Sequence, residues 1–367
     1  MDKSREIKNK RILIFICVLL TIIAIGLFYV YFIFQHRYKG RNIDNPWYIS
    51  SQFRLENIKT VQKDKDKDFV ILNLADLQTQ DVESPRVKRI IESEVDYLIK
   101  KTNPDLITLT GDQVWSNHNL LSTIWLINML DGYKIPYAPI FGNHDYGNTK
   151  NSSNADQNYC CDLYEKGKYS LFSRGPSNLG TLGNYVINVM EGTKIYKTIY
   201  MLDAGYEDKI TDNQIAWVKW NADGIKSING GEYTSAMCFM HKPLPEYKEA
   251  YEKYINGNDD VTSLGEVYVK YSLSGTIQNG FFDIAKQCNI VDIVCGHQHG
   301  NNFTLNYEGV RLTFALKTGQ LGGYYNDGIA NLNGATYFSM GSDVNIHNIY
   351  VKPNKFFITN EGNAFND

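Results

Sequence analysis

Short apolar runs alternate with amphipathic segments along most of the 367-residue chain. Runs such as Phe69–Leu74 (FVILNL) and Ile290–Cys295 (IVDIVC) are rich in β-branched residues and end at polar or glycine residues, which is typical of buried strands. Eight segments share this character and are predicted to be strands: Phe69–Leu74, Leu106–Thr110, Tyr137–Phe141, Tyr185–Val189, Thr198–Leu202, Ala236–Met240, Ile290–Cys295 and Val310–Ala315.

Helical periodicity separates several of these strands. In Pro85–Lys101 the apolar residues recur every three or four positions and form one face, and Pro85 stands where helices often begin. Similar spacing predicts further helices over Leu120–Leu130, Gln214–Ile225, Glu246–Ile255 and Phe281–Gln287. Alternating buried strands and helices predict an α/β fold whose helices cover the sheets. We expect one such domain over residues 68–360, followed by a C-terminal tail over 361–367.

The N-terminus departs from this pattern because Ile12–Phe34 contains no charged residue over about 23 positions. As a helix this segment would be ~34 Å long, enough to cross a hydrocarbon core of ~30 Å. A cleaved signal peptide is the alternative, but its apolar core would be shorter and would end at a small-x-small site, which GLFYVYFIFQHR does not offer. We therefore predict an uncleaved, single-pass transmembrane anchor over residues 12–34.

Charges around the anchor suggest its orientation. The basic residues before it predict that residues 1–11 stay in the cytoplasm and that the main domain is extracellular or lumenal, attached to the cell membrane. The excess of basic residues before the anchor is partly offset by three on its far side, Arg37, Lys39 and Arg41. Residues 35–67 end in the alternating charge run QKDKDKD, which predicts a solvated juxtamembrane tether.

Three further features narrow the possible functions. A net charge of −3 and a pI near 6.2 do not indicate a nucleic-acid partner. No C-x-x-C spacing occurs, so a thiolate metal site is not expected, and Cys160 and Cys161 are predicted to be an exposed pair in a polar loop. That loop belongs to a long polar insertion over residues 146–184, which is interpreted either as a functional lid or as a disordered surface segment.

Polar side chains directly follow five of the predicted strands. The last of these motifs is VCGHQHG, in which His297 and His299 leave the same side of an extended backbone and can enter one pocket. The other strand ends carry Ala-Asp-Leu-Gln, Gly-Asp, Gly-Asn-His-Asp and a single histidine, and contribute Asp76, Gln78, Asp112, Asn143, His144, Asp145 and His241. Because α/β sites assemble at the carboxyl ends of strands, these motifs are predicted to face one crevice.

The motif order resembles that of the calcineurin-like metallophosphoesterases, and FMHKPLPEY (Phe239–Tyr247) is similar to the purple-acid-phosphatase-like branch. The resemblance implies a four-layer α/β/β/α sandwich around two divalent metal ions. One ion would be held by Asp76, Gln78, Asp112 and His299, and the other by Asp112, Asn143, His241 and His297. Asp112 would then bridge both ions, while His144 and Asp145 would be catalytic.

Physical chemistry is consistent with this resemblance. An anionic bridge holds two mutually repelling cations together, and imidazole, carboxylate and amide ligands suit Mn²⁺, Fe or Zn²⁺. Metal-activated hydroxide would attack phosphorus in line, with His144 stabilising the phosphoryl group or protonating the leaving oxygen. We expect Asp145 to set the tautomer of His144 by a supporting hydrogen bond.

Two departures from the family pattern matter for function. Gln78 stands where the family usually has histidine, which favours Mn²⁺ because an amide oxygen is a harder donor than imidazole. Trp115 stands where the purple branch has a tyrosine ligand, and it offers no oxygen. The sequence therefore predicts a membrane-anchored phosphoesterase acting on a small phosphorylated substrate. Alternatives are a phosphodiesterase or nucleotide pyrophosphatase of the same family, or a non-catalytic scaffold.

Overall fold

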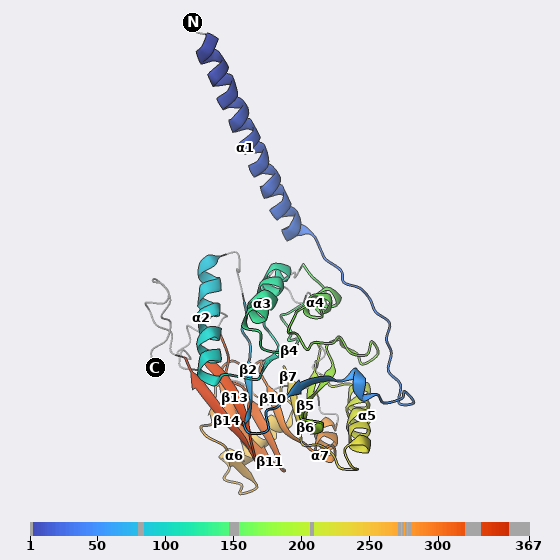
Figure 1. Ribbon diagram of the computed structural model, residues 1–367. Helices are drawn as coiled ribbons and strands as arrows, with labels where there is room; N and C mark the ends of the chain where they lie inside the picture. The colour runs from blue at the N-terminus through green and yellow to red at the C-terminus, as the bar shows by residue number, and fades with distance from the viewer. Residues whose placement is uncertain are drawn as a thin grey trace. The chain divides into compact units, whose positions relative to one another are not determined.

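Figure 1 shows the computed structural model of the chain. It describes residues 3–79, 84–116, 118–146, 154–205, 209–270, 273, 275, 277, 280–319 and 332–351. The chain forms two compact units, Met1–Tyr38 and Lys39–Asp367. The predicted C-terminal tail, residues 361–367, lies outside the described residues, as does the 147–153 part of the insertion.

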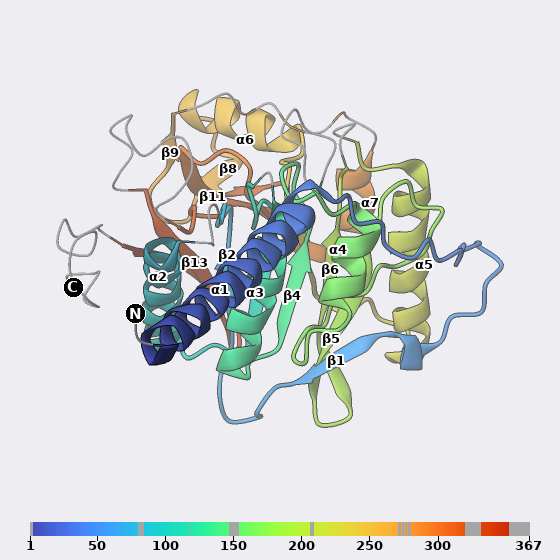
Figure 2. The ribbon, with the colours of Figure 1, turned by 90° about the horizontal axis from the view of Figure 1, so that it is seen from above.

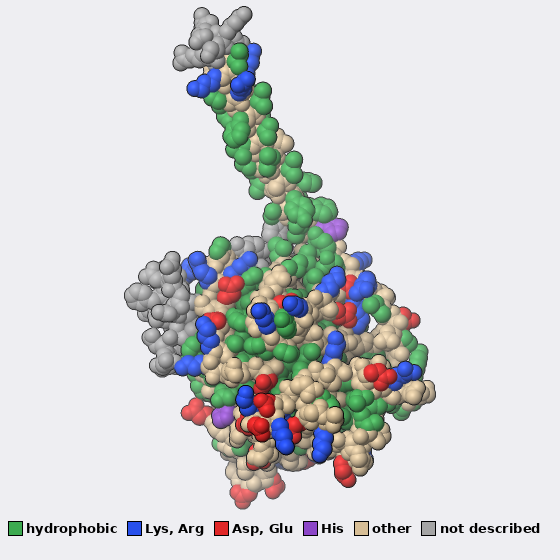
Figure 3. All heavy atoms as spheres, viewed as in Figure 1, with side chains coloured by type: hydrophobic (Ala, Val, Ile, Leu, Met, Phe, Trp, Pro, Cys, Tyr) green, Lys and Arg blue, Asp and Glu red, His purple; other side chains and the backbone are tan. Residues whose placement is uncertain are grey.

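The first unit is dominated by helix α1 (Lys3–Gln35). Its segment Ile7–Ile33 has a mean hydropathy of 3.0, and its side chains are not buried. Figure 3 shows hydrophobic side chains along this helix and basic ones near its N-terminal end. By length and composition this helix is a candidate membrane span, which agrees with the predicted anchor in position.

The second unit contains two β-sheets. The larger sheet has the strand order β1-β5-β6-β7-β10-β12-β11-β8, with β9 paired to β11. Its strands are β1 (Lys59–Gln62), β5 (Tyr185–Glu191), β6 (Lys194–Leu202), β7 (Ala236–Met240), β8 (Val261–Ser263), β9 (Tyr268–Val269), β10 (Ile290–Cys295), β11 (Asn301–Tyr307) and β12 (Val310–Phe314). At its centre β6, β7, β10 and β12 run parallel, so their carboxyl ends lie at one edge.

The smaller sheet has the order β14-β13-β2-β3-β4. Its strands are β2 (Phe69–Leu74), β3 (Leu106–Thr110), β4 (Tyr137–Ile140), β13 (Gly334–Met340) and β14 (Val344–Tyr350). Strands β2, β3 and β4 are parallel, whereas β13 pairs antiparallel with β2. The two sheets pack face to face, and Phe239 of β7 meets Phe338 of β13 with ring centroids 5.9 Å apart.

Helices cover the outer faces of both sheets. Figure 2 shows α2 and α3 beside β2 and β4, whereas α5 lies on the far side of β5 and β6. The helices of this unit are α2 (Pro85–Thr102), α3 (Asn119–Tyr133), α4 (Gln157–Tyr164), α5 (Asp212–Ile228), α6 (Glu246–Ile255) and α7 (Phe281–Gln287), with a short 3₁₀ turn η1 (Leu55–Asn57). Apolar residues of α5, α6 and α7 share one core with the larger sheet. The predicted α/β/β/α sandwich is confirmed.

Residues 39–62 pack along the second unit. Nε of Arg41 donates to Oδ1 of Asp162 at 3.0 Å. The side-chain amide of Asn178 pairs with the backbone of Trp47, accepting from its N–H at 2.8 Å and donating to its carbonyl at 2.7 Å. Further on, β1 pairs in parallel with β5. This part of the predicted tether therefore belongs to the folded unit, because side-chain and strand hydrogen bonds hold its backbone, while most of its side chains are exposed as the charge pattern predicted.

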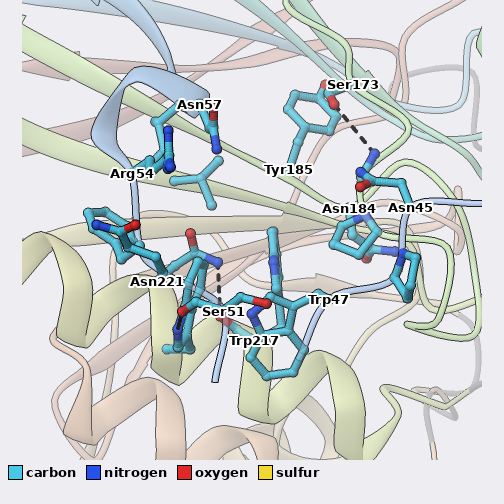
Figure 4. Close-up of a pocket in the computed structure, with 18 of the residues that line it drawn as sticks. Asn45, Trp47, Ser51, Arg54, Asn57, Ser173, Asn184, Tyr185, Trp217 and Asn221 are labelled. Atoms are coloured by element: carbon cyan, nitrogen blue, oxygen red, sulfur yellow. Dashed lines mark hydrogen bonds between the residues drawn. The ribbon is translucent and has the colours of Figure 1, made fainter. Parts of the chain in front are cut away.

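A cavity of about 430 Å³ lies between this segment and α5. Figure 4 shows Trp47 and Trp217 among its walls, with Asn221 of α5 and Tyr185 of β5 also lining it. None of the predicted metal ligands lines this cavity. It is therefore separate from the strand ends at which the sequence places the functional site.

The described part of the insertion, residues 154–184, is folded. Asp156 caps α4 by accepting from the N–H of Tyr159, and Nη2 of Arg174 forms salt bridges with Asp162 and Glu165. Cys160 and Cys161 are 1% and 0% exposed, so the prediction of an exposed pair is wrong. The physical reason is that α4 packs against α3 and turns both thiols inward.

Asp203, beyond β6, links the insertion to the turn after β4. Its Oδ2 accepts from the Tyr146 hydroxyl at 3.3 Å and from Nε2 of Gln157 at 3.1 Å. Burial raises the pKa of Asp203 from 3.8 to about 6. The folded state therefore binds this proton more tightly than the unfolded chain does, and the resulting stability is lost as pH rises through this window.

Asp203→Asn is expected to remove this pH dependence. Relative to the wild type, the variant should gain roughly 3 kcal/mol of unfolding free energy between pH 4 and pH 7, because a shift of one pKa unit corresponds to about 1.4 kcal/mol. Urea unfolding of the full chain in detergent at both pH values measures the difference. Asp259→Asn, at an exposed position, serves as the control and should follow the wild type. A constant difference between Asp203→Asn and wild type across this range would contradict the prediction.

Candidate metal centre

The loops that follow β2, β3, β4, β7 and β10 meet between the two sheets. They carry the seven residues predicted as metal ligands, namely Asp76, Gln78, Asp112, Asn143, His241, His297 and His299. Five of these side chains are buried, whereas Asn143 and His297 are partly exposed. Strands β2, β3 and β4 belong to the smaller sheet, and β7 and β10 belong to the larger one. The site is therefore built at the junction of both sheets.

Asp112 lies in a cluster with donors from the other sheet. Its Oδ2 is 3.3 Å from Nε2 of His241. The same nitrogen of His241 is 3.0 Å from Oδ1 of Asn143 and 3.1 Å from Nδ1 of His297. One donor atom each from Asp112, His241 and His297 lies within 4.8 Å of the others, so these three residues can hold a metal ion.

Asp76 forms a second cluster beside the first. Nε2 of His299 is 3.3 Å from Oδ1 of Asp76 and 3.0 Å from Nε2 of Gln78. Oε1 of Gln78 is buried and has no hydrogen-bond partner among the described residues. A buried amide oxygen without a partner is rare, and a cation at this position would satisfy it. The chemistry of this donor set therefore fits a divalent metal ion.

Four of the predicted ligands have left-handed backbone conformations. The φ angles are 54° for Asp76, 47° for Gln78, 52° for Asp112 and 75° for His297. Residues other than glycine rarely adopt this region, and strain of this kind gathers at functional sites. Backbone hydrogen bonds hold two of these residues: the N–H of Asp76 donates to Gly111 and that of Gln78 donates to Asp112.

Glycines in the motifs allow the close approach of neighbouring loops. A Cβ on Gly296 would lie 2.4 Å from Oδ2 of Asp76. A Cβ on Gly111 would lie 2.6 Å from Nδ1 of His241, and the φ of Gly111 is +83°. Both positions therefore require glycine, because only a residue without a Cβ lets the backbone approach the site this closely.

The electrostatics of the two clusters favour a cation. Burial lowers the pKa of His241, but the carboxylates of Asp112 and Asp76 outweigh burial and raise this pKa to about 10. Burial raises the pKa of Asp112, but the charge of and hydrogen bond with His241 lower it below the usual value. Burial, followed by the charge of His241, lowers the pKa of His297 to about 3. Ionised carboxylates thus concentrate negative charge between the sheets.

Asp145 supports the loops and does not bind His144. Its Oδ2 accepts from the N–H groups of Asp112 at 2.8 Å and Gly142 at 2.7 Å, and its Oδ1 accepts from Val114 at 2.9 Å. The predicted hydrogen bond with His144 is replaced by these contacts, because the tight turn after β4 directs the carboxylate back onto loop amides. His144 instead contacts Asp112: the backbone N–H of His144 donates to Oδ1 at 2.8 Å, and Nε2 of its imidazole lies 3.8 Å from Oδ2.

Two supporting residues were missed in the sequence. The ammonium of Lys317, which is 7% exposed, donates to the carbonyl of Asp76 at 2.9 Å and to that of Gly319 at 2.7 Å. The carbonyl of Thr110 lies 2.9 Å from Nδ1 of His241, which leaves Nε2 directed at Asp112. The sequence does show Lys317 as a lysine three residues beyond the end of β12. The role of Thr110 could not be predicted, because it depends on a backbone carbonyl, which every residue has.

Comparison with known proteins identifies the family. A sequence profile described as calcineurin-like phosphoesterase matches residues 69–301. The chain belongs to this family. The match includes all seven predicted ligands and both predicted catalytic residues, so the sequence resemblance to this superfamily is confirmed.

Curated relatives include phosphatases. The chain is 25% identical over 284 residues to Phosphatase DCR2 of Saccharomyces cerevisiae, covering 67% of this chain and 46% of the relative. It is 23% identical over 291 residues to a probable inactive purple acid phosphatase 28 of Arabidopsis thaliana, covering 67% of this chain and 69% of the relative. The match to the yeast phosphatase thus spans less than half of that protein.

Solved structures with a similar fold were also found. A dimetal phosphatase from Danio rerio has a TM-score of 0.45 at 9% identity, covering 77% of this chain and 96% of that chain. A Plasmodium structure described as GAP50, the anchor in the inner membrane complex, has a TM-score of 0.42 at 10% identity, covering 78% of this chain and 85% of that chain.

Proposed function

We propose that this protein is a membrane-anchored phosphoesterase that hydrolyses small phosphate esters with two divalent metal ions. The observation that carries the proposal is the convergence of seven potential ligands from five separate loops into two neighbouring clusters, one around Asp112 and one around Asp76. Asp76, Gln78, Asp112 and His299 would hold one ion. Asp112, Asn143, His241 and His297 would hold the other, and Mn²⁺, Fe and Zn²⁺ all suit this set, with Mn²⁺ favoured.

The chain's own residues have distinct tasks in this proposal. When bound, a pair of divalent cations acidifies water and neutralises the charge of a phosphoryl group. Asp112 and Asp76 would supply the negative charge that holds such cations. The carbonyl of Thr110 accepts a hydrogen bond from Nδ1 of His241 in the tautomer whose Nε2 carries the lone pair that can bind a metal ion. Asp145 keeps the Asp112 loop in place through two of its amides.

His144 is the proton donor in this proposal. Its side chain is 27% exposed and its Nε2 lies 3.8 Å from Oδ2 of Asp112, so the imidazole stands at the open side of the metal cluster. An alkoxide departs slowly unless its oxygen gains a proton as the bond to phosphorus breaks. His144 is placed to donate that proton to the departing oxygen.

Metal analysis and substrate turnover test the proposed function. The full chain in detergent is expected to retain close to two divalent ions and to hydrolyse p-nitrophenyl phosphate. Bis(p-nitrophenyl) phosphate is the comparison that separates monoesterase from phosphodiesterase activity. If folded protein binds metal but neither substrate is turned over with Mn²⁺, Zn²⁺ or Fe²⁺, the phosphoesterase proposal fails and a scaffold role is favoured.

Gln78→His is expected to shift the metal preference from Mn²⁺ toward Zn²⁺, because imidazole is a softer and stronger donor than the Gln78 amide. The shift is measured as the ratio of Zn²⁺ to Mn²⁺ dissociation constants, determined by competition titration of the metal-free protein. Gln298→His, at the partly exposed position between the two motif histidines, is the matched control. An unchanged ratio for Gln78→His would rule out Gln78 as a ligand.

The proposed location follows from α1. Its apolar segment would hold the protein in the cell membrane as a single-pass anchor, with the N-terminus in the cytoplasm and the phosphoesterase domain outside. Protease protection of the full chain in sealed spheroplasts or inverted vesicles tests this orientation. Cleavage of the phosphoesterase domain from the cytoplasmic side would contradict it.

A further inference from the structure

The imidazole of His144 is not held by the hydrogen bond to Nδ1 that is expected to orient a catalytic histidine. Its backbone is fixed by the N–H bond to Asp112. Its Nδ1 is buried, but it has no hydrogen-bond partner in the part of the chain that the structure describes. The adjacent carboxylate of Asp145 accepts from backbone amides at both of its oxygens. No described hydrogen bond from Nδ1 therefore sets the orientation of this ring.

The indole of Trp115 packs against the imidazole instead. The two ring centroids are 5.2 Å apart and the planes are inclined by 39°. Contacts of this kind between aromatic rings are favourable and depend on orientation. Trp115 is thus the described aromatic residue that limits rotation of the His144 ring.

The backbone beneath Trp115 is itself well anchored. Its N–H donates to the carbonyl of Thr79 at 3.2 Å, and the preceding residue, Val114, forms a bridge with Thr79. The N–H of Val114 also donates to Oδ1 of Asp145. One carboxylate therefore fixes both the loop that carries Asp112 and the segment that carries the indole. The indole is therefore a fixed surface against which the imidazole packs.

We propose that Trp115 is a positioning residue for His144: the indole holds the imidazole with its Nε2 on the side of Asp112, where the leaving oxygen of a phosphate ester departs. This inference rests on the proposed function. Small errors in the placement of a proton donor reduce its contribution strongly, because proton transfer requires hydrogen-bond reach. Packing would thereby perform the orienting role that a hydrogen-bonded carboxylate performs in many active sites.

Leaving-group dependence tests the proposal in the full chain. Trp115→Leu removes the ring, and Trp115→Phe keeps an aromatic wall. With phenyl phosphate, whose leaving oxygen needs a proton, Trp115→Leu is expected to lower kcat by roughly 10²-fold, while p-nitrophenyl phosphate loses less than about tenfold. KM and metal content should change little, and Trp115→Phe should recover most of the phenyl phosphate activity.

A second measurement does not need turnover. In metal-free protein, reaction of His144 with diethyl pyrocarbonate, followed by peptide mass spectrometry, reports how firmly the ring is shielded. Trp115→Leu should accelerate modification of His144 at least about threefold relative to Trp115→Phe, since the lost ring both shields and restrains the imidazole. Exposed His347 on β14 is the internal control and should react equally in all variants.

The kinetic and modification experiments have separate outcomes. Equal losses on both substrates, or equal behaviour of the Leu and Phe variants in kinetics and modification, would overturn the positioning role. Faster modification of His144 without a leaving-group effect would show that the indole shields the ring but does not position a proton donor, which also overturns it. Wild-type protein that loads metal but hydrolyses neither ester defeats the proposed function. Even if the protein is inactive, equal rates of His144 modification in Trp115→Leu and Trp115→Phe would show separately that the indole does not restrain the imidazole.

Discussion

Asp112→Asn is expected to lose bound metal and phosphoesterase activity together. Asp112 is the residue shared by the two proposed ligand sets, and its carboxylate lies 3.3 Å from His241 while also accepting the N–H of His144. Asparagine keeps the shape but removes the charge that two cations require. We expect kcat/KM to fall by more than the roughly 10²-fold that is typical of residues which only support ligands. Elemental analysis and p-nitrophenyl phosphate hydrolysis measure the two losses.

The stability of the metal-free protein distinguishes this effect from simple unfolding. Burial raises the pKa of Asp112 but His241 lowers it below the usual value, so the ionised Asp112 stabilises the metal-free fold, and metal-free Asp112→Asn should melt below metal-free wild type. Added Mn²⁺ should raise the melting temperature of the wild type but not that of Asp112→Asn, which separates lost metal binding from lost stability. A variant that retains two ions, or that gains as much from Mn²⁺ as the wild type, would contradict the bridging role.

His144→Ala is expected to separate catalysis from metal binding. His144 is not in either proposed ligand set, and its imidazole stands at the partly exposed side of the Asp112 cluster. Loss of a general acid lowers rates by roughly 10²- to 10⁴-fold, so kcat should fall within this range while metal content stays near the wild-type value. Steady-state kinetics and elemental analysis on the same preparation give both numbers.

His347→Ala is the matched control, because it removes an exposed imidazole on β14. It should leave both kcat and metal content unchanged. A proportional loss of activity and metal in His144→Ala would instead mean that this imidazole is a ligand or holds the ligand loops. In that case the role of Trp115 would also need to be reassigned.

The strands of the double sheet were predictable because most of them are buried on both faces. All eight predicted strands are present, and runs such as Leu106–Thr110 and Ala236–Met240 are buried at every position. A strand covered on both faces must be apolar throughout, which leaves a continuous signal in the sequence. The five predicted helices were found for a similar reason, since each buries one periodic face.

Edge elements were not predictable in the same way. Strand β14 (Val344–Tyr350) mixes apolar and polar residues and is half exposed, and it exists because β13 offers a free edge. Strand β1 (Lys59–Gln62) lies within the segment predicted as a tether and pairs with β5. Helix α4 is only eight residues long and contains two buried cysteines in a polar stretch. Each depends on a partner that is distant in sequence, which local patterns do not record.

The order of chemical groups along the chain determined much about this protein. Aspartate, glutamine, asparagine and histidine at five strand ends, with His297 and His299 two residues apart, were sufficient to identify the family and to nominate the ligands. Periodicity was sufficient for the layered fold. These features are local, because the spacing of residues along an extended strand sets the side to which each side chain points.

Only the folded chain decided which groups touch. It placed the carboxylate of Asp145 on loop amides instead of on His144, Trp115 against the His144 ring, and Lys317 on the carbonyl of Asp76. It also joined residues 39–62 to the domain by way of Asp162 and Asn178. The reason is physical: a hydrogen bond or ring contact depends on distances of a few ångströms between segments far apart in sequence, and packing sets those distances.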